Sequence, residues 1–268
     1  MKRTILALLL VLLIVPTFGS DKKYPSGARS AAMAYATVML PDFWSVFNNQ
    51  AGLAYINQMS AGIYHNMGMI REMSYQSVAF VYPTSTGTFA SSGTYYGYSK
   101  YNEIKAGLAF GKLLGESFSL GVQIDYYSTH IHGVEDDLAQ ITFEAGILYK
   151  PFDELYVGVH AYNPANSYYS YPKAYIPSVF RLGCAYSFDS RVMTTLEIEK
   201  ESEHNSSVKT GLEYSFLKNF NLRAGVIVNP VVFSFGMGYQ LNNFIVDLAF
   251  YRHQVLGYVP NFSLQVNL

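Results

Sequence analysis

The chain has 268 residues, of which 50% are hydrophobic and only 14% are charged, and its formal net charge is −1. An ordinary globular chain carries roughly 25% charged residues, so this balance is unusual for a protein whose whole surface faces water. The near-neutral charge gives no sign of the basic patch of a nucleic-acid-binding protein, and we expect no nucleic-acid partner. Cys184 is the single cysteine, which excludes an internal disulfide framework.

Residues 1–20 have the order of a secretory signal peptide. Lys2 and Arg3 precede the apolar run 5–15, and small residues follow it up to Ser20. We therefore expect this segment to be removed, with an uncleaved anchor as the alternative. Beyond it there is no stretch of about eighteen consecutive apolar residues, which excludes a bundle of membrane-spanning helices.

Residues 21–57 are rich in alanine and lack sustained alternation of apolar and polar residues. The small residues at 28–36 suit a short helix, Pro41 breaks it, and Asp42 is placed to cap a second short turn. Because the indole of Trp44 favours burial, a flexible leader is the weaker interpretation. We expect this segment to form a plug inside or beneath the mouth of a barrel formed by the rest of the chain.

Residues 58–268 break into blocks in which apolar and polar residues alternate, as in a strand with one apolar face. Most reach or approach the roughly 9 to 11 residues that a tilted strand needs to cross a bilayer. About fourteen blocks are predicted, an even number as in single-chain outer-membrane barrels. They are 59–67, 74–82, 88–98, 103–112, 116–131, 138–150, 155–162, 176–188, 191–199, 206–216, 220–229, 231–241, 244–251 and 259–268.

The connections between these blocks alternate between short and longer ones. Bacterial barrels have short periplasmic turns and longer outer loops, whereas a soluble sandwich has no reason to sort its loops in this way. The abundant tyrosine and phenylalanine suit an outer surface that faces lipid. We therefore predict an all-β fold: a transmembrane antiparallel β-barrel of about 14 strands, integral to the bacterial outer membrane and in contact with its lipid.

If the apolar faces point outward, the inward face carries charges of both signs. Isolated buried charges are costly, so the interior should be closed by ion pairs or filled with water. Inward glycines leave room for the N-terminal segment or for strand curvature. The predicted polar network of the lumen comprises Asp125, Glu144, Lys150, Arg181, Glu197, Glu199, Lys209, Glu213, Arg223 and Asp247.

Several phrases, taken in order, resemble the PorV/PorQ branch of the FadL-type outer-membrane barrels. They include GARSAAMAYATVMLPDFWSVFNNQAGLA at 27–54, SLGVQIDYYSTHI at 119–131 and VKTGLEYSFLKNFNLRAGV at 208–226. Gln50 stands where the family has the proline of an NPAGLA phrase. The resemblance covers almost the whole mature chain and implies about fourteen strands, an N-terminal inward segment and a bacterium of the Bacteroidota type.

The same resemblance implies a function without catalysis. Some members of that branch serve type IX secretion, so we expect an accessory or cargo-holding component of a secretion or surface-assembly complex with a partner protein in the envelope. The alternative is a FadL-like channel for hydrophobic small molecules, for which the charged inward face offers no obvious apolar route. A purely structural membrane protein is the third interpretation.

The loop 161–177 groups five tyrosines among asparagines and prolines. They either form an aromatic girdle at the outer interface or a docking surface for a partner, because exposed tyrosines are typical interface anchors. The candidate partner-binding residues are Tyr162, Tyr168, Tyr169, Tyr171 and Tyr175.

His130 and His132 stand beside acidic residues 135–137 and form a weak candidate for a metal site. A polar outer loop explains them better. The sequence contains no G-x-S-x-G elbow, phosphate-binding glycine loop or HExxH motif, and we expect neither an enzyme nor a cofactor.

Overall fold

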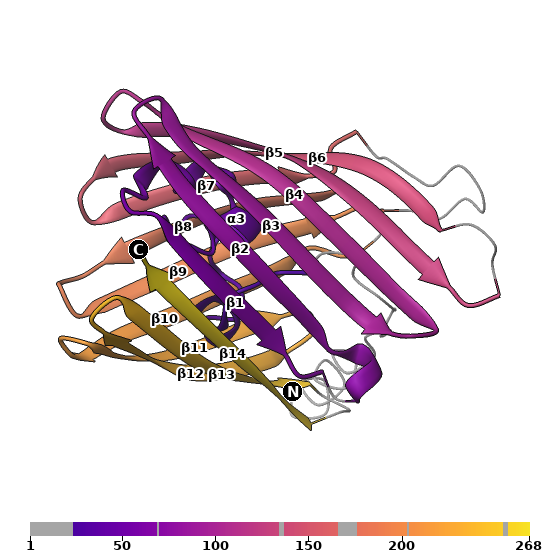
Figure 1. The fold of residues 1–268 in the computed structure, drawn as a ribbon. Helices are drawn as coiled ribbons and strands as arrows, with labels where there is room; N and C mark the ends of the chain where they lie inside the picture. Colours follow the sequence, from indigo (N-terminus) through magenta and orange to yellow (C-terminus); the bar gives the residue numbers. More distant parts are fainter. Residues whose placement is uncertain (1–23, 69, 134–136, 166–175, 203, 254–256) are drawn as a thin grey trace, which may run out of the picture.

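The computed structural model describes residues 24–268 except residues 69, 134–136, 166–175, 203 and 254–256. Its strands form one closed antiparallel barrel, in which each strand pairs with its neighbours in the chain and β1 pairs with β14 (Figure 1). Residues 1–20, the predicted signal peptide, lie outside the described residues. The prediction of a 14-stranded barrel is confirmed.

All fourteen predicted blocks are strands, and β7 has the predicted bounds. The largest shift at a strand's start is at β8, which begins three residues later than expected. The strands are β1 Ser60–Asn66, β2 Tyr75–Thr84, β3 Gly87–Tyr98, β4 Tyr101–Leu114, β5 Phe118–Ile131, β6 Leu138–Phe152, β7 Leu155–Tyr162, β8 Val179–Ser187, β9 Val192–Glu201, β10 Ser207–Leu217, β11 Phe220–Val228, β12 Val232–Leu241, β13 Phe244–His253 and β14 Gly257–Asn267.

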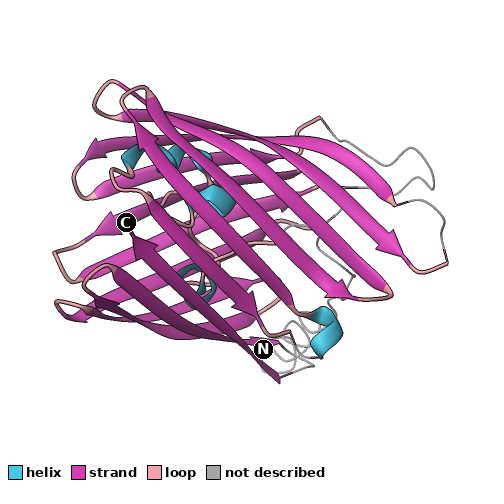
Figure 2. Cartoon of the chain, viewed as in Figure 1, coloured by secondary structure: helices cyan, strands magenta, loops and turns pink. Residues whose placement is uncertain are grey.

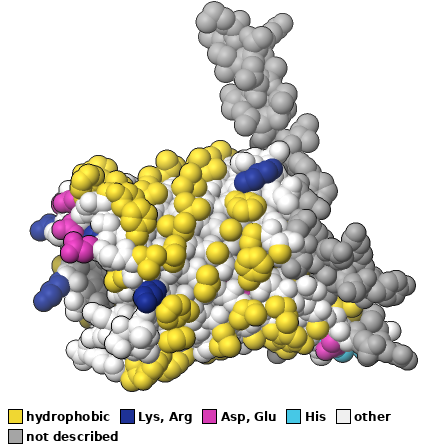
Figure 3. All heavy atoms as spheres, turned by 90° about the horizontal axis from the view of Figure 1, so that it is seen from above, with side chains coloured by type: hydrophobic (Ala, Val, Ile, Leu, Met, Phe, Trp, Pro, Cys, Tyr) yellow, Lys and Arg dark blue, Asp and Glu magenta, His cyan; other side chains and the backbone are white. Residues whose placement is uncertain are grey.

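Alternation along the strands gives the barrel two unlike faces. On β5, Val122 and Ile124 are exposed, whereas Gln123 and Asp125 are buried in the lumen. Figure 3 shows hydrophobic side chains spread over the visible outer face, with charged side chains toward its two ends. Exposing so many apolar side chains to water is unfavourable, so an outer surface of this kind is stable when lipid covers it.

The two ends of the barrel differ in their connections. Short turns and the C-terminus lie at one end, and the longer loops lie at the other (Figure 1). Following the usual rule for bacterial barrels, we call the first end periplasmic and the second extracellular. Within the described ranges, no helix is both long enough and apolar enough to cross a membrane.

Residues 24–57 fold inside the barrel and are called the plug below (Figure 2). The plug contains α2 Ala28–Ala32, α3 Ser45–Asn48 and the 3-10 helix η1 Gln50–Tyr55, while a second 3-10 helix, η2 Arg71–Met73, precedes β2. The first helix is shorter than expected because Ala34 and Tyr35 take positive φ angles that turn the chain.

Two of the inward glycines allow the plug to touch the wall. A Cβ at Gly121 would lie 2.1 Å from Ala51 N, and a Cβ at Gly158 would lie 2.4 Å from Val38 O. Both distances are far below van der Waals contact, so these positions exclude any larger residue while the plug is in place.

Candidate functional site

Three clusters of buried charge join the plug to the wall. In the first, Arg181 on β8 donates to Glu197 on β9 through Nε at 2.8 Å and Nη2 at 3.1 Å. The other nitrogen of the guanidinium, Nη1, donates to the carbonyl of Asn48 in the plug at 2.9 Å. Glu197 Oε2 accepts the backbone N–H groups of Thr37 and Val38, both at 2.9 Å. The pair therefore fixes the backbone of the plug as well as neutralising its own charge.

The same cluster continues along the wall. Lys209 on β10 donates to Glu199 at 2.7 Å and lies 3.5 Å from Glu197. Arg181, Glu197, Glu199 and Lys209 thus carry two charges of each sign. Balanced pairing is what makes such deep burial tolerable in a medium of low dielectric constant.

The second cluster lies on β4 to β7. Glu144 accepts from Lys105 and, at 2.8 Å, from the side-chain amide of Gln50 in the plug. His160 Nε2 lies 3.0 Å from the same carboxylate, and Asp125 lies 3.4 Å from Lys105 Nζ. Gln50 is therefore a contact between plug and wall.

The third cluster lies at the periplasmic end. Arg29 of the plug donates to both carboxylate oxygens of Glu213, at 2.7 and 2.8 Å, and to Asp42 at 2.8 Å. Arg223 donates to Glu213 and to Asp247. Although burial alone lowers the pKa of Arg29, the carboxylates of Glu213 and Asp42 raise it above its ordinary value, so the guanidinium stays charged.

Asp42 is the weaker partner in this cluster. Burial raises the pKa of its carboxyl against the opposing influence of Arg29. The formal N-cap of α3 is Trp44, but Asp42 opens the turn before this helix as predicted, because its carbonyl accepts a hydrogen bond from the backbone N–H of Ser45 at 3.0 Å. We call the contact of Arg29 with Glu213 the plug latch, since its two parallel hydrogen bonds make it the better-defined link.

A polar cavity of about 330 Å³ adjoins the latch at the periplasmic end. Arg29 and Asp42 line it from the plug, and Asn221, Gln265 and Asn267 line it from the wall. Aromatic rings close the lumen on the other side of the plug. They include Tyr64, Tyr75, Tyr127 and Tyr162 of the wall, all buried.

The structure brings nine of the ten predicted lumen residues into these clusters and leaves Lys150 apart. Lys150 donates to Asp153 at 2.7 Å beside a periplasmic turn. Sequence reasoning missed Arg29 and Gln50 as anchors of the plug. A signal was present, because Arg29 and Asp42 are the two charged residues in the sequence of 24–57 and carry opposite signs.

The expectation that Tyr162 belongs to an exposed docking surface is wrong. Its side chain is 2% exposed, and its hydroxyl is hydrogen-bonded to that of Tyr127 inside the barrel. Tyr162 faces inward because it occupies the last lumen-facing position of β7. The other four candidates, Tyr168, Tyr169, Tyr171 and Tyr175, lie outside the described residues.

His130, near the end of β5, and His132, just after it, do not form a metal centre with described residues. His130 Nδ1 lies 2.8 Å from Asp137 Oδ1, and both side chains are exposed. Across the described part of the chain, no three His, Cys, Asp or Glu side chains come together to hold a metal ion. His132 lies beyond the end of β5 at an exposed position.

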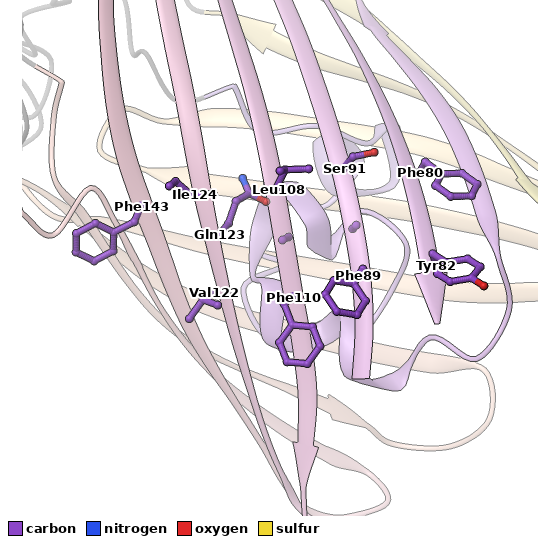
Figure 4. A pocket seen from close by; sticks show the side chains of 12 residues that line it. Phe80, Tyr82, Phe89, Ser91, Leu108, Phe110, Val122, Gln123, Ile124 and Phe143 are labelled. Atoms are coloured by element: carbon purple, nitrogen blue, oxygen red, sulfur yellow. The ribbon is translucent and has the colours of Figure 1, made fainter. Parts of the chain in front are cut away.

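Two apolar grooves mark the outer wall over β3. The lower groove has a volume of about 640 Å³ and passes Ser91, where the wall lacks a large side chain (Figure 4). Its sides are the exposed side chains of Phe80, Tyr82, Phe89, Leu108 and Phe143 and the half-buried ring of Phe110. The upper groove, of about 610 Å³, lies nearer the extracellular end around Gly93 and Ala106.

No family model matches the chain, and no curated protein sequence matches it. Solved structures of similar fold do exist. A Pseudomonas aeruginosa FadL homologue superposes with a TM-score of 0.70 at 12% identity, over 90% of this chain and 98% of that one. The Ralstonia pickettii toluene transporter TbuX gives 0.70 at 11% identity, again over 90% and 98%. The Pseudomonas putida toluene transporter TodX gives 0.65 at 13% identity, over 89% and 96%.

These identities are low, so the likeness concerns the arrangement of the chain. It extends over nearly the full length of each solved barrel. The chain therefore has the fold of the FadL-type barrels, which are integral proteins of the bacterial outer membrane.

Proposed function

We propose that this barrel transports small hydrophobic molecules across the outer membrane, without catalysis. The observation that carries the proposal is the fold. A plug inside a 14-stranded barrel matches proteins described as toluene transporters and as a monoaromatic hydrocarbon channel over about nine-tenths of the chain. This reverses the ranking favoured by the sequence, in which the channel was the alternative.

The charged inward face does not oppose this function. Lumen charges pair with one another and with the plug, as Arg181 does with Glu197 and with the carbonyl of Asn48. Charges used in this way hold the plug, and those of Arg29 and Asp42 also line the periplasmic cavity. They therefore give no preference for an accessory role over a channel.

The path of a solute through the barrel is determined by the plug, which fills the lumen. The plug separates the buried tyrosines from the periplasmic cavity, so a molecule that crosses the barrel needs the plug to shift. The plug latch lies beside that cavity, and its opening widens the exit toward the periplasm. Transport is then limited by how often the plug moves, as is common for proteins gated by a loop or lid.

A tether between plug and wall tests this route. A Cβ at Gly211 would lie 2.9 Å from Met33 Cβ and 2.7 Å from Thr195 Oγ1, whereas the Cβ atoms of a disulfide are roughly 3.8 Å apart, so the plug must move about 1 Å from β10 to hold one. Met33→Cys with Gly211→Cys, in a Cys184→Ala background, should block uptake of labelled toluene by cells when oxidised and restore it when reduced. Each single-cysteine variant is the control. Equal uptake with and without the barrel would refute transport.

The second candidate function is an accessory role in type IX secretion, as some members of the PorV/PorQ branch have. The source would then be a bacterium of the Bacteroidota type. This role is supported by the order of sequence phrases, and the four tyrosines at 168–175 remain its proposed docking residues. Cross-linking in intact cells separates the two functions. Capture of one envelope protein through that loop, with toluene uptake unchanged by deletion of the gene, would favour secretion.

A further inference from the structure

The upper groove has a floor of small residues on the lipid-facing side of the wall. Gly93 on β3 is the cross-strand partner of Ala106 on β4, and both point outward. Ile63 and Val78 rise beside them as exposed aliphatic walls. The depression is therefore built by residue size and needs no gap in the hydrogen bonding of the sheet, since β3 pairs without a register shift on both sides.

One end of the upper groove is polar. His65, Gln76 and Tyr95 lie side by side on β1, β2 and β3 as successive cross-strand partners. They line the groove at its extracellular end, and the next row toward the periplasm is apolar. His65 Nδ1 is buried and has no hydrogen-bond partner among the described residues. That nitrogen is not open to the groove, but the exposed side chains of Gln76 and Tyr95 place a polar row next to an apolar trough, which makes the site amphipathic.

The length of the trough fits one leaflet of the membrane. From Tyr95 the two grooves follow β3 past Gly93 and Ser91 to Phe89, six residues along the strand. Six residues span about 20 Å, and a strand tilted by about 40° descends about 15 Å over that distance. That depth is about half of the roughly 30 Å hydrocarbon core.

We propose that the two grooves together, called the β3 groove, bind one amphiphile of the outer leaflet. Its acyl chain lies over Gly93 and Ser91, and its polar headgroup is hydrogen-bonded by His65, Gln76 and Tyr95. The occupant comes from the membrane because the groove lies within the apolar belt, which lipid covers. The proposal goes beyond transport, because the β3 groove is on the outer wall and not on the route through the plug.

Native mass spectrometry of the full barrel in a mild detergent, with palmitoyl lysophosphatidylcholine as the probe, tests the proposal. Wild type should retain one probe molecule. Ala106→Phe fills the floor and should weaken binding roughly 15- to 60-fold, as expected from displacing two or three buried methylenes. Ala224→Phe is the matched control, because Ala224 also points outward and lies on β11, diametrically opposite β4 in the 14-strand barrel.

His65→Ala tests the polar end. It should weaken binding of the lysophospholipid several-fold and leave binding of a plain alkane unchanged. Equal retention by Ala106→Phe and Ala224→Phe would overturn the proposal, as would a dimer of barrels that carries no probe. Toluene uptake by Ala106→Phe should equal that of wild type, so a failure of lipid binding is distinguishable from a failure of transport.

Discussion

Arg181 on β8 and Glu197 on β9 form an ion pair within the wall, and both of them also hold the backbone of the plug. The guanidinium reaches the carboxylate at 2.8 and 3.1 Å, and the same carboxylate accepts two backbone N–H groups of the plug. Removing one partner of a buried pair leaves the other charge without compensation, which typically costs about 3–5 kcal/mol. Glu197→Gln should therefore lower the free energy of unfolding by an amount of that order.

Urea unfolding of the refolded barrel in lipid vesicles measures this loss. Glu199→Gln is the comparison, because Glu199 is partly exposed and its carboxylate pairs with Lys209 of the wall at 2.7 Å. Its effect should be clearly smaller. Equal losses for the two variants would show that Glu197 does not hold the plug.

The plug lies so close to the wall at Gly121 that a side chain at this position should displace it. Gly121→Ala places a methyl group 2.1 Å from Ala51 N, and backbone on both sides prevents relief. The plug should be displaced and become sensitive to protease in the folded barrel. Gly93→Ala is the control, since its nearest contact is a side-chain atom of Val78 at 3.5 Å. A resistant plug in Gly121→Ala would contradict the packing.

The plug latch should control leakage. Glu213→Gln removes the carboxylate that accepts two hydrogen bonds from Arg29, a change worth about 2 kcal/mol for bonds to charged groups. Asp42→Asn removes one bond from a partly exposed carboxyl and should cost less than about 1 kcal/mol. In planar bilayers, Glu213→Gln should open to ions more often than either wild type or Asp42→Asn. The reverse order would exclude the latch.

Arginine substitutions at two heights of the outer wall test whether it lies in the membrane. Leu108 is 66% exposed in the middle of β4, and an arginine at the midplane of a barrel costs about 2–4 kcal/mol. Leu217 is also exposed but ends β10 beside a periplasmic turn, where the cost falls to about 0–1 kcal/mol. Leu108→Arg should thus destabilise the vesicle-bound barrel and Leu217→Arg should not. Similar stabilities would argue against a lipid-facing wall.

The sequence by itself determined the barrel. Period-two alternation, as in Val122 to Asp125, marks two faces along each strand, and every strand turned out where such a block was predicted. This works because strand pairing between neighbours is local, and because lipid imposes one rule on every outward position.

Only the tertiary structure decided what the inward residues do. Arg29 and Glu213 are 184 residues apart in the sequence, and Gln50 and Glu144 are 94 residues apart. A local sequence pattern reveals contacts between near neighbours only, so it could not predict either pair. Tyr162 looks like an exposed loop residue until closure of the barrel buries it. Pairing across a lumen depends on which strands face each other and on where the plug enters, and both are set by the closed fold as a whole.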